Sequence, residues 1–140
     1  MDKTQKLGSC LCKEVTYAYS GKSKVFQYCH CSRCRKFTGS AHASNIIVDP
    51  EQFTWLSGED LVGRYEVPEA NHFATSFCKH CGSSLPWLTQ SGKAMVIPAG
   101  TLDDDPDEKP IHNIFYADKA CWYEDVDSLI KYDGLPVKPK

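Results

Sequence analysis

Short stretches in which β-favouring residues alternate with polar ones recur along the whole chain. Gly, Pro, Asp and Ser separate these stretches, which follow one another about every ten residues. A period of two is typical of strands that face the core on one side and solvent on the other. We therefore expect an all-β, mainly antiparallel domain with strands over 14–20, 24–29, 43–49, 52–58, 61–67, 72–78, 83–88, 94–100, 112–117 and 121–124.

Helical patterning is scarce, so we expect one or two short helices. One or two turns follow Cys34, and "DVDSLIKY" (125–132) begins on a possible capping Asp and ends before Gly134. The acidic run 103–109 lacks the alternation of a calcium loop and predicts a solvated loop. With 140 residues the chain suits a single domain, 1–140, with a core over about 7–133 and a frayed Pro/Lys C-terminal tail.

Charge and hydropathy exclude some partners. The 16 basic and 18 acidic residues give a net charge of −2, and no basic stripe appears, so we expect no nucleic acid. The start "MDKTQKLGSCLC" lacks the apolar core of a signal peptide, and no stretch approaches the roughly 18 apolar residues that span a bilayer. These features predict a cytoplasmic protein with no membrane partner.

Eight cysteines dominate the candidate chemistry. A reducing cytosol favours thiolates on metal over disulfides, and two cysteines in a C-x-C pair are too close to bridge each other without strain. They form two pairs, one triplet and one singleton: Cys10 with Cys12, Cys78 with Cys81, Cys29 with Cys31 and Cys34, and Cys121 alone. This spacing predicts metal binding.

The segment "CKHCG" (78–82) is the most specific local signal. A C-x-x-C pair followed by Gly predicts a tight knuckle whose backbone amides point at the sulfurs, with the glycine at positive φ. Two thiolates do not complete a tetrahedral zinc site, so another pair must come from elsewhere in the chain.

Two partitions of the cysteines are open. If Cys10 and Cys12 join the knuckle, one closed site forms and the triplet keeps an open position, as catalytic zinc sites do. If Cys31 and Cys34 join it instead, an ordinary zinc ribbon forms and three cysteines are stranded. Spacing favours the first partition, since it uses every clustered cysteine. An iron–sulfur cluster is a third possibility, although C-x-C-x-x-C matches neither common ferredoxin spacing.

Several segments together resemble the glutathione-dependent formaldehyde-activating enzyme family, which also contains the centromere protein V domain. They occur in the family's order and spacing over about residues 7–133: "GSCLCKEVTY" (8–17), "YCHCSRCRKFTGS" (28–40), "FCKHCGSSL" (77–85), "IPAGTLDD" (97–104) and "KACWYE" (119–124). The resemblance implies a β-tent fold and two Zn²⁺ ions per chain. It also implies a structural zinc on Cys10, Cys12, Cys78 and Cys81, and a catalytic zinc on Cys29, Cys31 and Cys34.

The activity implied by the resemblance is that of a carbon–sulfur lyase. In the condensing direction, glutathione or a similar small-molecule thiol would combine with formaldehyde or a related small electrophile. This chain departs from the family pattern at two places. Cys121 stands where a proline is common, and Asn113 replaces a histidine, with His112 one position earlier. We expect Cys121 to be a buried apolar residue and assign no role to His112.

Zinc on three thiolates is a weak Lewis acid, so such a site suits an incoming thiol better than it suits water activation. A neighbouring proton donor is then needed, and the candidates beside the triplet are Ser32, Thr38, Ser40 and His30, although a solvent-exposed position is expected for the histidine. Arg33, Arg35 and Lys36 could steer the carboxylates of glutathione. Aromatic residues, including Phe37, Trp55, Trp87 and Trp122, are expected in the core.

Two other functions compete with the enzyme. A non-catalytic zinc-binding scaffold of the same fold would have a fourth protein ligand at the triplet. A thiol redox sensor would lose its metal on oxidation and show no turnover.

Overall fold

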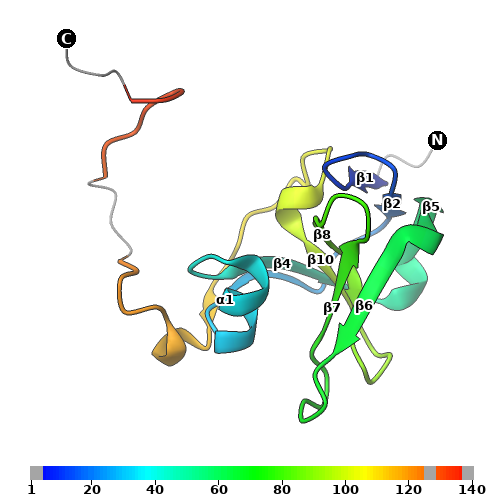
Figure 1. Ribbon diagram of the computed structural model, residues 1–140, viewed down its shortest axis with the longest axis horizontal. Coiled ribbons are helices and arrows are strands. Elements are labelled where there is room, and N and C mark those ends of the chain that lie inside the picture. The colour runs from blue at the N-terminus through cyan, green and yellow to red at the C-terminus, as the bar shows by residue number, and fades with distance from the viewer. Residues whose placement is uncertain (1–4, 125–128, 137–140) are drawn as a thin grey trace.

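The computed structural model describes residues 5–124 and 129–136, and these residues form three small sheets (Figure 1). All strand pairs are antiparallel except the one that joins β11 to β3. The first sheet has the order β1 (Lys6–Ser9), β2 (Thr16–Tyr19), β5 (Phe53–Ser57). The second has the order β11 (Asn113–Ile114), β3 (Val25–Cys29), β4 (Ala43–Val48), β10 (Met95–Pro98), β9 (Trp87–Leu88). The third has the order β6 (Val62–Glu66), β7 (Ala74–Cys78), β8 (Ser84–Leu85).

The main core lies between the first and second sheets. Ile46 of β4 and Ile97 of β10 are directly opposite in register, and both are fully buried. Tyr17 enters from β2, and its hydroxyl bonds the Thr101 hydroxyl at 2.6 Å. Its ring covers Gly8 so closely that a Cβ on this glycine would lie 2.2 Å from the ring. The register between β1 and β2 therefore requires glycine at this position.

Helical structure is limited to short elements, as predicted. The helix α1 (Ser32–Thr38) contains Cys34 and so begins earlier than predicted. It ends on Gly39, whose φ of 63° is the left-handed conformation that glycine favours at a helix C-terminus. Four single 3-10 turns accompany it: η1 (Pro50–Gln52), η2 (Glu59–Leu61), η3 (Ala99–Thr101) and η4 (Tyr116–Asp118). The predicted helix over 125–132 falls partly on 125–128, outside the described residues, and 129–132 form no helix. No helix in the described part of the chain is long and apolar enough to cross a membrane.

The all-β prediction is confirmed, with differences at three segments. The predicted strand 83–88 is divided at Pro86 into β8 and β9, which belong to different sheets, because proline cannot donate to a sheet ladder. β1 was not predicted, since "KLGS" is too short to show alternation. The prediction for 121–124 was wrong. These residues form a turn and irregular chain, and Ala120 is the last buried residue before them.

The acidic run is mostly exposed, as predicted, and it also fastens β1. The carboxylate of Asp104 accepts from the Leu7 backbone N–H at 2.7 Å, and that of Asp103 accepts from the Ser9 hydroxyl at 2.9 Å. Lys6 bonds Asp107 at 2.6 Å. The edge strand that precedes the first cysteine pair is thereby held in place.

Candidate functional site

Four cysteine thiols from two distant segments meet at one point. The sulfurs of Cys10, Cys12, Cys78 and Cys81 all lie within 4.8 Å of one another. Two of these distances are 3.5 Å, between Cys10 and Cys12, and 3.8 Å, between Cys12 and Cys78. A tetrahedral zinc with Zn–S bonds of about 2.3 Å separates its sulfurs by about 3.8 Å. The thiols therefore fit a single ion of this size.

Tight turns present both halves of this four-cysteine cluster. The Cys81 backbone N–H donates to the Cys78 sulfur at 3.4 Å, and Gly82 has the expected positive φ of 80°. In the other half, the Val15 backbone N–H donates to the Cys10 sulfur at 3.4 Å. The knuckle predicted from "CKHCG" is thus confirmed, and the N-terminal pair forms a second turn that faces it.

The four-cysteine cluster is partly buried: Cys10 and Cys78 are buried, whereas Cys12 and Cys81 are half-buried. Fully buried Val15 and Leu85 pack against it, and Cys78 is itself fully buried. The Ser83 side chain and backbone hydrogen-bond the Cys81 sulfur and lower the pKa of its thiol to about 5. His80 lies inside the knuckle and pairs with Glu14 at 3.0 Å.

The three remaining clustered cysteines form a second group at the junction of β3 and α1. Cys29 ends the strand, Cys31 is the N-cap of the helix, and Cys34 lies in its first turn. Their sulfurs lie within 4.8 Å of one another. The Cys31 sulfur accepts from the Cys34 backbone N–H at 3.3 Å, so a candidate metal ligand also caps the helix. No other Cys, His, Asp or Glu of the described residues joins this three-cysteine cluster.

Contacts among these three thiols divide their charge unequally. Hydrogen bonds from Cys29 and Cys34 lower the pKa of Cys31 strongly. Hydrogen bonds to Cys29 and Cys31, together with burial, raise the pKa of Cys34. The cluster therefore concentrates negative charge at Cys31, the most accessible of the three thiols. Both the donor set and this charge suit a thiophilic cation.

A cavity of about 680 Å³ opens beside the three-cysteine cluster. Its walls are apolar where Phe73 and Trp87 face it, with ring centroids 5.2 Å apart. Polar side chains from several elements also line it: Gln27, Ser32, Arg33, Asn45, Asn71, His72 and Asp118. The cavity has the size and mixed lining of a small-molecule site.

Comparison with known proteins decides the family. The family model described as glutathione-dependent formaldehyde-activating enzyme matches residues 5–118. This chain belongs to that family. A crystal structure of a Rhodobacter sphaeroides protein, determined as a structural-genomics target, is similar in fold, with a TM-score of 0.61 and 17% identity. The match covers 76% of this chain and 98% of that one. A search of curated proteins found no match.

Within this member of the glutathione-dependent formaldehyde-activating enzyme family, the structure separates the cysteines as the first partition does. Cys31 and Cys34 lie in a different cluster from Cys78 and Cys81, so the alternative zinc ribbon is not formed. Cys121 belongs to neither cluster and is exposed, so its predicted burial was wrong. The adjacent Trp122 is also exposed, contrary to the prediction, because the chain leaves the sheets after Ala120.

The candidate proton donors occupy different environments. Ser32 lines the cavity, whereas Thr38 donates to the Cys34 carbonyl at 2.8 Å and Ser40 is exposed and does not line the cavity. The prediction of an exposed His30 was wrong, because this residue is fully buried. Its Nε2 bonds the Asn113 side chain at 2.9 Å, and its ring packs near Tyr116. His30 therefore contacts the segment 113–116 and does not line the cavity.

The basic residues in and directly after the triplet also occupy different environments. Arg33 lines the cavity, Lys36 lies along a neighbouring groove, and Arg35 is half-buried. His112, to which no role was assigned, bonds the side chain of Gln27 in the cavity wall at 2.8 Å.

Sequence reasoning missed several polar residues of the cavity, namely Asn45, Asn71, His72 and Asp118. They come from β4, from the loop before β7 and from η4, with no shared spacing that would reveal them.

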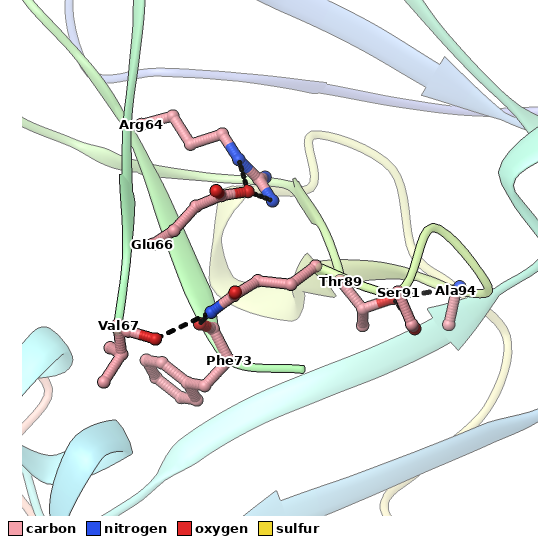
Figure 2. A network of polar contacts seen from close by, with 8 residues as sticks. Arg64, Glu66, Val67, Phe73, Thr89, Ser91 and Ala94 are labelled. Carbon is pink, nitrogen blue, oxygen red and sulfur yellow. Dashed lines mark hydrogen bonds and ion pairs between the residues drawn. The ribbon is translucent and has the colours of Figure 1, made fainter. Parts of the chain in front are cut away.

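The side chain of Gln90 holds the loop 67–73, which supplies part of the cavity wall. The Gln90 side-chain amide donates to the Phe73 carbonyl at 2.6 Å and to the Val67 carbonyl at 3.0 Å (Figure 2). The Gln90 backbone N–H donates to the His72 carbonyl at 2.9 Å. Residues 67–73 are thus closed into a loop that places Phe73 against the three-cysteine cluster.

Proposed function

We propose that this chain is a zinc-dependent enzyme of the carbon–sulfur lyase type, which condenses a thiol such as glutathione with formaldehyde or a related small electrophile. Membership of the family indicates glutathione-dependent formaldehyde activation. The observation that carries the proposal is that the three-cysteine cluster opens onto a cavity of about 680 Å³. We also propose a single domain, 1–140, with its core over about residues 7–133, and a cytoplasmic location.

Each cluster is proposed to hold one zinc ion, which gives two per chain. A structural zinc on Cys10, Cys12, Cys78 and Cys81 is supported by four sulfurs within 4.8 Å and by their close packing. A second zinc on Cys29, Cys31 and Cys34 is supported by three sulfurs at similar separations. This second ion would supply a position at which an incoming thiol is stabilised as its thiolate.

The side chains around the cavity support the remaining chemistry. Phe73 and Trp87 exclude water from one wall, which strengthens electrostatic interactions inside. Arg33 lies at the cavity and offers a bidentate partner for a substrate carboxylate. The amides of Asn45 and Asn71 are available to orient a carbonyl oxygen.

The bond-forming step balances without any redox partner. The substrate thiolate sulfur attacks the aldehyde carbon, a carbon–sulfur bond forms, and the carbonyl π electrons move to the oxygen, which takes up one proton. Ser32 and His72 are the proton donors that the cavity offers, since both line it. The side chain of His72 also bonds the Ser91 hydroxyl at 3.2 Å through Nδ1, which holds its ring in position.

The test follows hydroxymethyl exchange between glutathione and formaldehyde by NMR. Wild type is compared with Cys31→Ser and with Cys121→Ser, whose cysteine lies outside both clusters. We expect wild type and Cys121→Ser to accelerate exchange equally and Cys31→Ser to lose the acceleration. Metal analysis should give about two zinc ions per chain for wild type and for Cys121→Ser. Equal exchange in all three proteins would exclude glutathione-dependent formaldehyde activation at this cluster.

A further inference from the structure

A second groove adjoins the cavity along α1. It has a volume of about 450 Å³, and its lining is mainly apolar, with Phe37, Tyr65, Val67 and Phe73. Three residues, Ser32, Arg33 and Phe73, line both the groove and the cavity of the three-cysteine cluster. A molecule whose reactive end lies at the cluster can therefore extend into the groove past the start of α1.

Strand alternation explains why one face of β6 and β7 is apolar here. Tyr65 lies opposite Thr75 in the register of the two strands, and both side chains line the groove. Arg64 and Glu66 alternate with Tyr65 and do not line the groove; they pair with each other at 2.8 Å (Figure 2). Their charges are thus neutralised away from the groove, which leaves an exposed aromatic side chain facing α1.

The charged residues among the described ones that line the groove are all basic. Arg33 and Lys36 line it from α1, and neither makes an ion pair with a residue of the described chain. No carboxylate side chain of the described residues lines the groove. An apolar floor with cations at its margin is complementary to a chain that is apolar along its length and carries a carboxylate.

The floor is held in shape before any ligand binds. Two of its members, Val67 and Phe73, are the residues whose carbonyls accept from the Gln90 side chain. The Val67 backbone N–H also donates to the Phe73 carbonyl at 3.3 Å. A groove that is already formed costs little ordering when it is filled.

We propose that this groove binds the non-reacting part of the thiol substrate, and that this part is an apolar chain bearing a carboxylate. The inference rests on the proposed function, because it places the thiol at the three-cysteine cluster. Glutathione is polar along its whole backbone and gains little from Phe37, Tyr65 and Val67. An apolar thiol with a carboxylate is therefore the better substrate class for this member of the family.

The test compares three thiols as co-substrates of formaldehyde: 8-mercaptooctanoate, glutathione and 2-mercaptoethanol. We expect Tyr65→Ser and Lys36→Glu each to raise KM for 8-mercaptooctanoate about tenfold, the equivalent of about 1.4 kcal/mol. KM for 2-mercaptoethanol, which is too short to reach the groove, should not change. Leu56→Ser is the matched control. Leu56 of β5 is 53% exposed, close to the 56% of Tyr65, but Leu56 does not line the groove. Equal KM values for 8-mercaptooctanoate in all variants would overturn the inference.

A binding measurement separates this inference from the lyase proposal. Octanoate has no thiol, and its binding is followed by saturation-transfer NMR on wild type, Lys36→Glu, Leu56→Ser and Cys31→Ser. We expect binding to every protein except Lys36→Glu. If octanoate binds in this pattern and no thiol reacts, the groove assignment stands and the lyase proposal fails. If thiols react with formaldehyde but octanoate does not bind, or binds equally to Lys36→Glu, the groove assignment fails and the lyase proposal stands.

Discussion

The two cysteine clusters use the same chemical group but differ in the number of sulfurs and in the number of chain segments that supply them. Two turns that are 66 positions apart in the sequence face each other in the four-cysteine cluster, and its sulfurs lie within 4.8 Å of one another. The three-cysteine cluster comes from one segment of six residues, 29–34, and opens onto the cavity. Enclosure by two segments favours a stabilising role, whereas supply from a single segment leaves room for a substrate.

Packing around the clusters follows the same division. Val15 and Leu85, both fully buried, cover the four-cysteine cluster. Half-buried Phe73 and Ile114 pack on the three-cysteine cluster and also line the cavity. Loss of a thiol should therefore reduce stability in the first cluster and activity in the second.

The largest effect is expected from Cys78→Ser. Cys78 is fully buried and joins β7 to the knuckle, so loss of the metal would remove the link between the two turns. We expect the free energy of unfolding to fall by more than about 4 kcal/mol, because metal binding at such a site contributes directly to folding. Urea denaturation measures this change. Cys121→Ser should change the same quantity by less than about 0.5 kcal/mol, and equal midpoints for the two variants would contradict a structural role.

Cys31→Ser should reduce activity strongly and stability only slightly. Serine is itself a good N-cap, so α1 should keep its start and the free energy of unfolding should change by less than about 2 kcal/mol. Exchange between thiol and formaldehyde should fall at least about 100-fold, since the metal loses a ligand at the cavity. NMR exchange and urea denaturation on one preparation measure both quantities. A loss of stability as large as that of Cys78→Ser would remove the distinction between the clusters.

Chelation should separate the two proposed zinc ions by rate. The three-cysteine cluster is reached from the cavity and offers three protein donors, whereas the four-cysteine cluster offers four, with Val15 and Leu85 packed against it. We expect the first zinc equivalent to leave at least about tenfold faster than the second, a difference of about 1.4 kcal/mol in barrier. A colorimetric zinc indicator follows release, and circular dichroism follows folding. Release of both equivalents at one rate, together with unfolding, would contradict this order.

The smallest effect concerns the loop beside the three-cysteine cluster. Gln90 bonds two carbonyls there. Gln52, which does not line the cavity, donates likewise to the Ser20 and Lys22 carbonyls and also accepts from the Asp49 backbone N–H. We expect Gln90→Ala and Gln52→Ala to cost a similar amount of stability, about 1–2 kcal/mol. Only Gln90→Ala should raise KM, by about threefold, the equivalent of about 0.7 kcal/mol. Steady-state kinetics of both variants decides whether the loop positions the substrate.

Prediction from sequence succeeded where the signal was local. Nine of the ten predicted strand segments are present, although the seventh is divided at Pro86. It failed where a side chain's surroundings depend on distant segments. His30 is buried, with His42 and Tyr116 beside its ring, and its Nε2 bonds the side chain of Asn113, 83 positions later. Cys121 is exposed because the sheets end before it.

The sequence by itself determined the alternating strands, the glycine turns at Gly39 and Gly82, and the grouping of cysteines that are close in the chain, because each depends on a few neighbouring backbone angles. Only the tertiary structure decided that Cys12 meets Cys78, 66 positions later, and that the triplet borders a cavity. Spacing left two partitions open, and sheet topology selected one by bringing two particular turns together. The cavity and the groove depend on the same topology, since their walls come from strands and loops that are remote in sequence.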